Sequence, residues 1–319
     1  MIDLLQVRLR QILGVGRENG MMPIETVLIG VTYACQCDCI HCGAALSRDP
    51  KRKELSSKEI KTLIAQCLDI HATSVGFFGG EPLMRKDIHA LITCARSHGF
   101  CTNLDTNGAL LTKPFAHRLK AAGLNIIGVS IDSSDPDTHD ALRRKKGLFA
   151  KAIRGIRHCI AEGIKCYIST YATHENVSNG DLLKVIQLAR SEEADWIRIC
   201  APFAAGKWIS RTENRLTSEE RALIERFSDA DPEYIVLEDR NGCPGIQQRL
   251  LYISAYGDVQ PCCYVPVKFG NIRDERLADI VERIQHHPMY KRYGKLKNCP
   301  MNNDAFRHEF IRPLLLKGP

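Results

Sequence analysis

The sequence predicts an α/β protein: a partial (β/α)6 TIM-like barrel followed by a small C-terminal α+β module. In the first two-thirds of the chain, short β-branched runs alternate with amphipathic segments, and several of these segments end at glycine. After about residue 210 the alternation stops. Alternating strands and helices are typical of a parallel sheet with right-handed crossovers, which curls toward a barrel. Six such units are too few for the closed barrel of eight.

Six barrel strands are predicted, and helices separate them. The strands are Thr26–Thr32, Ser74–Phe78, Cys101–Asp105, Ile126–Ile131, Lys165–Tyr171 and Trp196–Cys200. The helices are Ser57–Leu68, Asp87–His98, Lys113–Ala122, Leu148–Glu162 and Asp181–Ser191. Ser56 and Glu59 have the spacing of a capping box, which marks the beginning of the first helix.

The pattern beyond the barrel predicts a helix, a hairpin and a second helix. These elements are Thr217–Phe227, Leu250–Ser254 with Gly257–Gln260, and Asp274–Ile284. The tail beyond Pro288 is basic and is expected to be irregular. Met1–Gly14 has the apolar spacing of an amphipathic helix. We therefore divide the chain into an N-terminal helical extension (1–25), a barrel (26–215) and a C-terminal module (216–319).

Composition narrows the class of protein. The 319-residue chain is 44% hydrophobic, carries a net charge of +7 and contains 14 cysteines. It has no apolar run long enough for a transmembrane segment and no secretion signal. No block of Lys and Arg is dense enough to indicate nucleic-acid binding. We therefore expect a cytoplasmic protein whose cysteines are thiols or metal ligands.

One group of cysteines directly follows the first predicted strand, where parallel sheets bind ligands. Cys35, Cys39 and Cys42 lie in one tight loop with the spacing Cys-x3-Cys-x2-Cys. Such a loop can present thiolates to three irons of a cubane cluster and leave the fourth iron open. Zinc sites commonly use Cys-x2-Cys pairs instead. Cys37 is off this spacing and is not expected to be a ligand.

This loop resembles that of the radical S-adenosylmethionine (SAM) superfamily, whose motif is Cys-x3-Cys-x-aromatic-Cys after the first barrel strand. The resemblance covers roughly residues 26–205. It implies a [4Fe–4S] cluster whose open iron binds the amino and carboxylate groups of SAM. Reductive cleavage of SAM then gives a 5′-deoxyadenosyl radical, which abstracts a hydrogen atom from the substrate. His41 stands at the aromatic position, a departure that leaves its stacking on adenine open.

Residues after the next three predicted strands also match positions where the family binds SAM. Glycines after the second strand let the backbone approach the ligand, and the glutamate beside them is implied to accept from its ammonium group. Arg143 is implied to pair with the SAM carboxylate, ahead of the adjacent Arg144, Lys145 and Lys146. The implied SAM-binding residues are Gly79, Gly80, Glu81, Thr106, Ser130, Arg143 and His41.

A second group of cysteines resembles the SPASM and twitch auxiliary-cluster modules of the same superfamily, which open with Cys-x(9–15)-Gly-x4-Cys. Cys243, Gly257 and Cys262 have this spacing. The resemblance implies one auxiliary [4Fe–4S] cluster held by Cys243, Cys262 and Cys299. Cys263 is a candidate fourth ligand, but neighbouring residues of a strand point to opposite faces. A substrate, water or another side chain are the alternatives.

The resemblance predicts an enzyme that oxidises or rearranges its substrate after hydrogen abstraction. The auxiliary cluster would accept an electron or bind the substrate, which is a small molecule or a peptide. A flavodoxin or ferredoxin is the implied electron donor, and no residue can be named as a catalytic base. The alternatives are a peptide or protein maturase, a cofactor-assembly enzyme, a non-catalytic iron–sulfur electron carrier and a zinc-bound scaffold.

Overall fold

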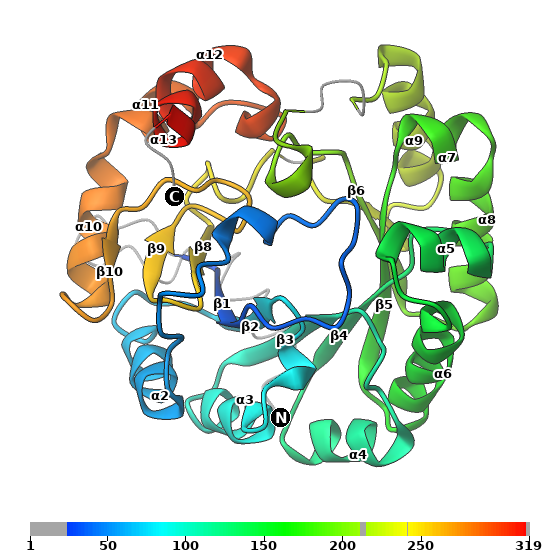
Figure 1. The fold of residues 1–319 in the computed structure, drawn as a ribbon, viewed down its shortest axis with the longest axis horizontal. Coiled ribbons are helices and arrows are strands. Elements are labelled where there is room, and N and C mark those ends of the chain that lie inside the picture. The colour runs from blue at the N-terminus through cyan, green and yellow to red at the C-terminus, as the bar shows by residue number, and fades with distance from the viewer. Residues whose placement is uncertain (1–23, 211–214, 241, 317–319) are drawn as a thin grey trace.

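The computed structural model describes residues 24–210, 215–240 and 242–316. A single curved sheet of ten strands forms the centre of the molecule, and helices surround its outer face (Figure 1). The helix expected at Met1–Gly14 lies outside the described residues. Within the part of the chain that is described, no helix has both the length and the apolar character needed to cross a bilayer.

The strands follow one another in the sheet in the order β10-β9-β8-β1-β2-β3-β4-β5-β6-β7. The six predicted strands are present with bounds close to those expected, and the run from β8 through β1 to β7 is parallel throughout. The strands are β1 (Thr26–Thr32), β2 (Ser74–Gly79), β3 (Cys101–Thr106), β4 (Ile126–Ser130), β5 (Lys165–Tyr171), β6 (Trp196–Cys200), β7 (Ile235–Leu237), β8 (Leu250–Ile253), β9 (Asp258–Gln260) and β10 (Gly270–Asn271).

Five of the seven predicted helices follow the predicted bounds within two residues, and the other two differ by up to three residues. The helix α2 shows why: Ser56 Oγ accepts from the Glu59 amide and Glu59 Oε2 accepts from the Ser56 amide, which completes the predicted capping box. The helices are α2 (Ser57–Gln66), α3 (Ile88–Ser97), α4 (Lys113–Ala121), α5 (Pro136–Arg143), α6 (Leu148–Ala161), α7 (His174–Ser178), α8 (Asp181–Ser191), α9 (Ser218–Ala230), α10 (Leu277–His286), α11 (Pro288–Tyr293), α12 (Asp304–Phe306) and α13 (Arg312–Leu316).

The sheet extends beyond the six predicted strands at both edges. β7 pairs in parallel with β6, and β8 pairs in parallel with β1, placing Leu250 opposite Thr26. The predicted hairpin β8–β9 is therefore part of the barrel sheet rather than a separate sheet. The predicted partial barrel is confirmed, and the C-terminal segment lengthens it.

The tail beyond Pro288 is helical, and the expectation of irregular structure was wrong. Pro288 occupies the first turn of α11, where its missing amide costs nothing, and His287 Nδ1 accepts from the Met289 amide. Tyr293 and Phe306 are buried against each other, so tertiary packing stabilises these short helices.

The segment between β1 and α2 crosses the carboxyl-end face of the barrel, as the dark blue trace in Figure 1 shows. This segment carries the first cysteine group. It includes one turn of 3-10 helix, η2 (Ala45–Ser47), which contacts another such turn, η4 (Gly206–Trp208), after β6. The fold thus places the cysteine loop over the ends of the parallel strands.

Candidate functional site

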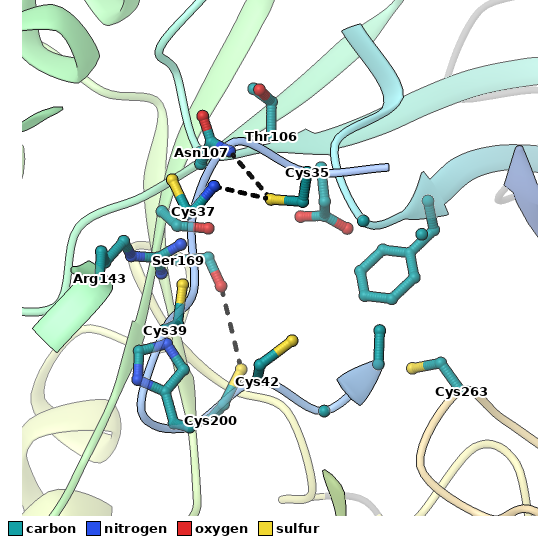
Figure 2. Close-up of a pocket in the computed structure, with 18 of the residues that line it drawn as sticks. Cys35, Cys37, Cys39, Cys42, Thr106, Asn107, Arg143, Ser169, Cys200 and Cys263 are labelled. Atoms are coloured by element: carbon teal, nitrogen blue, oxygen red, sulfur yellow. Dashed lines mark hydrogen bonds between the residues drawn. The ribbon is translucent and has the colours of Figure 1, made fainter. Parts of the chain in front are cut away.

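Cys35, Cys39 and Cys42 line one large pocket at the carboxyl ends of the strands (Figure 2). The pocket encloses about 1040 Å³ of space free of protein atoms, part of it open to solvent. Side-chain donors approach two of the sulfurs: Asn107 Nδ2 lies 3.8 Å from Cys35 Sγ, and Arg48 Nη2 lies 3.9 Å from Cys42 Sγ. Donors beside thiolates are what an anionic iron–sulfur cluster requires, so this loop fits the predicted cluster.

Cys37 lies in the same loop but is nearly buried. Its amide donates to Cys35 Sγ at 3.4 Å, and hydrogen bonds with its side chain are the largest cause that lowers the pKa of Cys35 and Cys39. Cys37 therefore supports the other thiols from within the loop. That Cys37 is not a cluster ligand stays a prediction.

Two neighbouring elements hold the cysteine loop in place. Asp38 forms ion pairs with Arg144 at the end of α5 and with Lys207 in η4. The Lys207 amide donates to the Cys42 carbonyl at 3.1 Å. Gly206 has φ +53°, and a Cβ there would lie 2.1 Å from the Cys42 carbonyl oxygen, so only glycine permits this approach.

A buried trio of Asp132, Arg143 and His41 stands beside the loop. Arg143 Nε is 2.7 Å and His41 Nε2 is 3.4 Å from Asp132 Oδ2. Burial alone would raise the pKa of Asp132, but Arg143 and His41 lower it well below its usual range. Burial lowers the pKa of His41 to about 4, so this imidazole is neutral near pH 7. The structure places Arg143 in the pocket and Arg144 at the surface.

The other residues predicted to bind SAM also gather here, with one exception. Gly79, Gly80, Thr106 and Ser130 line the pocket together with Arg143 and His41. Gly79 has φ +134°, and a Cβ on it would lie 2.2 Å from the Thr32 carbonyl oxygen. Because they lack side chains, Gly79 and Gly80 allow the loop after β2 to contact the loop after β1. Their backbone atoms also line the pocket without a side chain in front of them.

Glu81 is the exception, because its side chain is fully buried and is not part of the pocket lining. Its carboxylate accepts from Thr106 Oγ1 at 2.8 Å and from the amides of Leu83 and Asn107 at 3.0 and 2.9 Å. Burial raises its pKa to about 7 despite these hydrogen bonds. Glu81 thus ties the loop after β2 to the loop after β3.

Apart from Tyr171, whose place near the end of the fifth strand allows it either to line the pocket or to pack, the aromatic and cationic side of the pocket was not predicted. The hydroxyls of Tyr33 and Tyr252 lie 3.2 Å apart, and those of Tyr171 and Tyr264 lie 3.3 Å apart. Arg198 Nη2 donates to Asp105 at 2.9 Å. The further lining residues are Phe78, Asp105, Ser169, Thr170 and Cys200. An arginine inside the apolar strand β6 was an available signal, because a charge is rarely buried without a purpose.

The second group of cysteines gathers at a separate cavity behind Tyr264. Cys243, Cys262 and Cys299 line it, and each is at least nine-tenths buried. A hydrogen bond from Cys299 lowers the pKa of Cys243, so these thiols are in contact. Gly257, at φ +89°, turns the hairpin that brings Cys262 to Cys243. Cys263 lines both this cavity and the main pocket, and Figure 2 shows it across the pocket from the cysteine loop.

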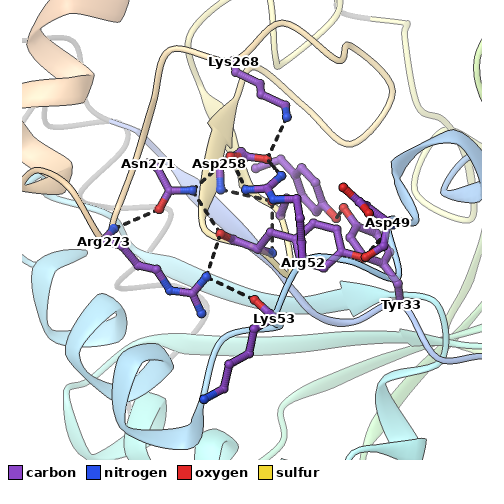
Figure 3. Close-up of polar contacts among 11 residues, drawn as sticks. Tyr33, Asp49, Arg52, Lys53, Asp258, Lys268, Asn271 and Arg273 are labelled. Carbon is purple, nitrogen blue, oxygen red and sulfur yellow. Dashed lines mark hydrogen bonds and ion pairs between the residues drawn. The ribbon is translucent and has the colours of Figure 1, made fainter. Parts of the chain in front are cut away.

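A polar network connects the segment after the cysteine loop with the β9–β10 hairpin (Figure 3). Asp258 accepts from both terminal nitrogens of Arg52, at 2.5 and 2.9 Å, and from Asn271 Nδ2 at 3.0 Å. Lys268 Nζ lies 3.2 Å from the same carboxylate. Burial alone would raise the pKa of Asp258, but these donors lower it. The network fixes the outer end of the cysteine segment.

Comparison with protein families gives two matches. The radical SAM superfamily matches residues 29–189, and the SPASM iron–sulfur cluster-binding domain matches residues 243–303. The first group of cysteines therefore lies within the radical SAM match, and the second lies within the match to the iron–sulfur cluster-binding domain.

Among curated proteins, the chain is similar to an AdoMet-dependent heme synthase of Nitratidesulfovibrio vulgaris. The identity is 30% over 307 residues, which covers 86% of this chain and 83% of the relative. It is 34% identical over 194 residues to the Fe-coproporphyrin III synthase of Methanosarcina barkeri, covering 61% of this chain and 48% of that protein.

Solved structures share the fold at low sequence identity. Streptococcus suis SuiB bound to the precursor peptide SuiA matches with a TM-score of 0.67 at 16% identity, covering 92% of this chain and 71% of SuiB. Native anSMEcpe with bound AdoMet matches with a TM-score of 0.65 at 16% identity, covering 92% of this chain and 98% of that one. Both agree with the predicted fold.

Proposed function

Because the chain belongs to the radical SAM superfamily, we propose that it is a cofactor-assembly enzyme that alters the carboxylate side chains of a tetrapyrrole. The sequence left small molecules, peptides and cofactor assembly open as alternatives. Relatives named for heme and Fe-coproporphyrin III synthesis support cofactor assembly. The peptide-bound structure shares only 16% identity and supports the fold alone.

The family and its SPASM domain bring the predicted cofactors: a SAM-binding [4Fe–4S] cluster, SAM and auxiliary iron–sulfur ligation. When bound, the first cluster and SAM supply a radical that abstracts hydrogen. Two alternatives from the sequence, a non-catalytic iron–sulfur electron carrier and a zinc-bound scaffold, are therefore not pursued. Cys35, Cys39 and Cys42 would hold the first cluster, and the Arg143 guanidinium would bind the SAM carboxylate. The pocket backbone of Gly79 and Gly80 would receive the SAM ammonium group.

The observation that carries the tetrapyrrole proposal is the pairing of an aromatic wall with arginines in one pocket. Tyr33, Tyr252 and Tyr264 lie on the lining, and a planar macrocycle packs well against aromatic rings. Arg48 also lines the pocket and forms no ion pair with any described residue. Arg198 Nη1 likewise has no hydrogen-bond partner in the described part of the chain. Guanidinium groups of this kind suit carboxylate side chains.

A propionate side chain shows how the chemistry balances. Its conversion to a vinyl group releases carbon dioxide, one hydrogen atom and one electron. The hydrogen atom goes to the deoxyadenosyl radical, and the electron needs an acceptor. The cavity of Cys243, Cys262 and Cys299 adjoins the pocket through Tyr264 and Cys263; these cysteines would hold an auxiliary cluster, which would supply an electron acceptor. A flavodoxin or ferredoxin would supply the electron that starts the reaction.

The test is anaerobic incubation of reconstituted protein with SAM, dithionite and iron coproporphyrin III, followed by mass spectrometry. We expect 5′-deoxyadenosine together with a porphyrin that has lost carbon dioxide and two hydrogens for each side chain altered. Cys35→Ala should abolish deoxyadenosine, whereas Cys299→Ala should impair mainly turnover of the porphyrin. Deoxyadenosine that is unaffected by the porphyrin, with no change in porphyrin mass, would reject the tetrapyrrole proposal.

A further inference from the structure

Three thiols of the cavity behind Tyr264 are the expected ligands of the auxiliary cluster, but a cubane cluster has four irons. Cys243, Cys262 and Cys299 supply those thiols, and much of the rest of the cavity is apolar, including Leu28, Phe203 and Leu250. An iron without a protein ligand would need a polar group from this same lining. The lining offers three such side chains: Glu238, Asp239 and Cys263.

Glu238 directly follows β7 and lines the cavity. Its Oε2 is inaccessible to solvent and accepts no hydrogen bond of normal geometry from the described residues; the thiol that approaches this carboxylate is that of Cys200, on the side of the main pocket. A buried carboxylate oxygen without a donor is costly, and such an atom calls for an explanation such as a missing ion. Glu238 lines this cavity together with Cys243, Cys262 and Cys299, which places its carboxylate beside the cysteines.

The other two candidates for the fourth ligand, Asp239 and Cys263, fit less well than Glu238. Asp239 is held by Arg221, whose Nη1 lies 2.9 Å from Oδ1 and 3.1 Å from Oδ2. Cys263 follows Cys262 directly and also lines the main pocket, where it faces the cysteine loop (Figure 2). Cys263 stands in the turn that the Val265 amide closes on the Cys262 carbonyl at 3.3 Å, and it is shared between the two cavities. Glu238, in contrast, lines the auxiliary cavity alone.

We propose that the Glu238 carboxylate is the fourth protein ligand of the auxiliary cluster and that the Cys263 thiol stays free in the reaction pocket. The orphaned Oε2 then has an iron partner, and the Cys3Glu set accounts for all four irons. This inference rests on the auxiliary cluster implied by the SPASM domain and is independent of which substrate the enzyme uses.

Iron analysis, Mössbauer and EPR spectra of the anaerobically reconstituted holoprotein test the assignment. Glu238→Ala should lose about one iron per chain and give the EPR signal of a three-iron cluster after mild oxidation. Glu238→Cys should keep the four-iron cluster but change the Mössbauer parameters of one iron site. Cys263→Ala should retain the iron content and spectra of the wild type.

Asp239→Asn is the matched control, because it changes a carboxylate of the same cavity that Arg221 already holds; its spectra should equal those of the wild type. Loss of the whole auxiliary cluster in Glu238→Ala, restored by Glu238→Cys, supports the proposal. Loss in both variants, or a Glu238→Ala spectrum identical to wild type, overturns it. A three-iron cluster in Cys263→Ala also overturns it and assigns the fourth iron to Cys263.

Discussion

At the scale of single residues, the charge states of Asp132, Arg143 and His41 depend on one another because all three side chains are buried. Asp132 holds Arg143 through Nε at 2.7 Å, which fixes the plane of the guanidinium beside the cysteine loop. Because His41 is neutral near pH 7, Asp132 and Arg143 form the only full charge pair of this trio. A guanidinium fixed in this way can meet a carboxylate with two parallel hydrogen bonds.

Arg143→Lys should weaken SAM binding about tenfold or more, because an ammonium keeps the charge but loses the bidentate fork. Anaerobic equilibrium dialysis with labelled SAM measures the change. Arg144→Lys is the matched control, since Arg144 is the next residue and pairs with Asp38 at the surface. If the two variants bind SAM with equal affinity, Arg143 does not bind the SAM carboxylate.

That the cysteines of the first loop and Arg143 line one pocket could be predicted, because the loop spacing and the family resemblance both depend on residues close together in the chain. The supporting position of Glu81 could not, because its three donors come from two different loops. Three of the four pocket tyrosines were missed for the same reason: Tyr33 and Tyr252 are 219 residues apart and meet only through the pairing of β1 with β8.

At the scale of elements, the cysteine loop depends on the short turn η4. The Lys207 amide and side chain both bind the loop, and Gly206 lies against the Cys42 carbonyl. Strong periodicity made β1 to β6 predictable. α5 is short and polar and β7 has three residues, so neither carries enough of a pattern to be recognised from sequence.

Gly206→Ala should lower the iron content of the first cluster while the fold is retained. A Cβ there would lie 2.1 Å from the Cys42 carbonyl oxygen, so the loop must move away from its position. Gly180→Ala is the control: this glycine has φ +77° and no atom within 4 Å of the added Cβ. Both variants carry a backbone strain of about 1 kcal/mol, and only the first carries the clash.

Iron and sulfide analysis with circular dichroism distinguishes the two effects. We expect Gly180→Ala to reconstitute like wild type and Gly206→Ala to bind substantially less iron at equal helix content. If both variants bind equal amounts of iron, η4 does not position the loop.

At the scale of the whole molecule, one sheet joins the two family matches. β8 follows the barrel by some 50 residues yet pairs along β1, and the Arg52–Asp258 network spans the same junction. The sequence predicted the barrel and the hairpin separately. Their union could not be predicted, because a strand pairing between residues 26 and 250 leaves no local pattern.

This continuity predicts that the barrel and the C-terminal module unfold together. Ile253 in β8 is fully buried, and Ile253→Ala should cost about 2–5 kcal/mol through the cavity it leaves. Because β8 shares its hydrogen bonds with β1, the barrel should lose the same stability as the module. Trp196 and Trp208 report on the barrel by fluorescence, and the absorbance of the iron–sulfur clusters reports on both sites.

In urea unfolding under anaerobic conditions, we expect both signals of Ile253→Ala to shift to the same lower midpoint. Val236→Ala is the control, since Val236 lies in the edge strand β7 and is 37% exposed; its midpoint should move far less. Two separated transitions, with tryptophan fluorescence unmoved by Ile253→Ala, would mean that the C-terminal module unfolds independently despite the shared sheet. A single transition would mean that damage to either cluster site is transmitted to the stability of the other.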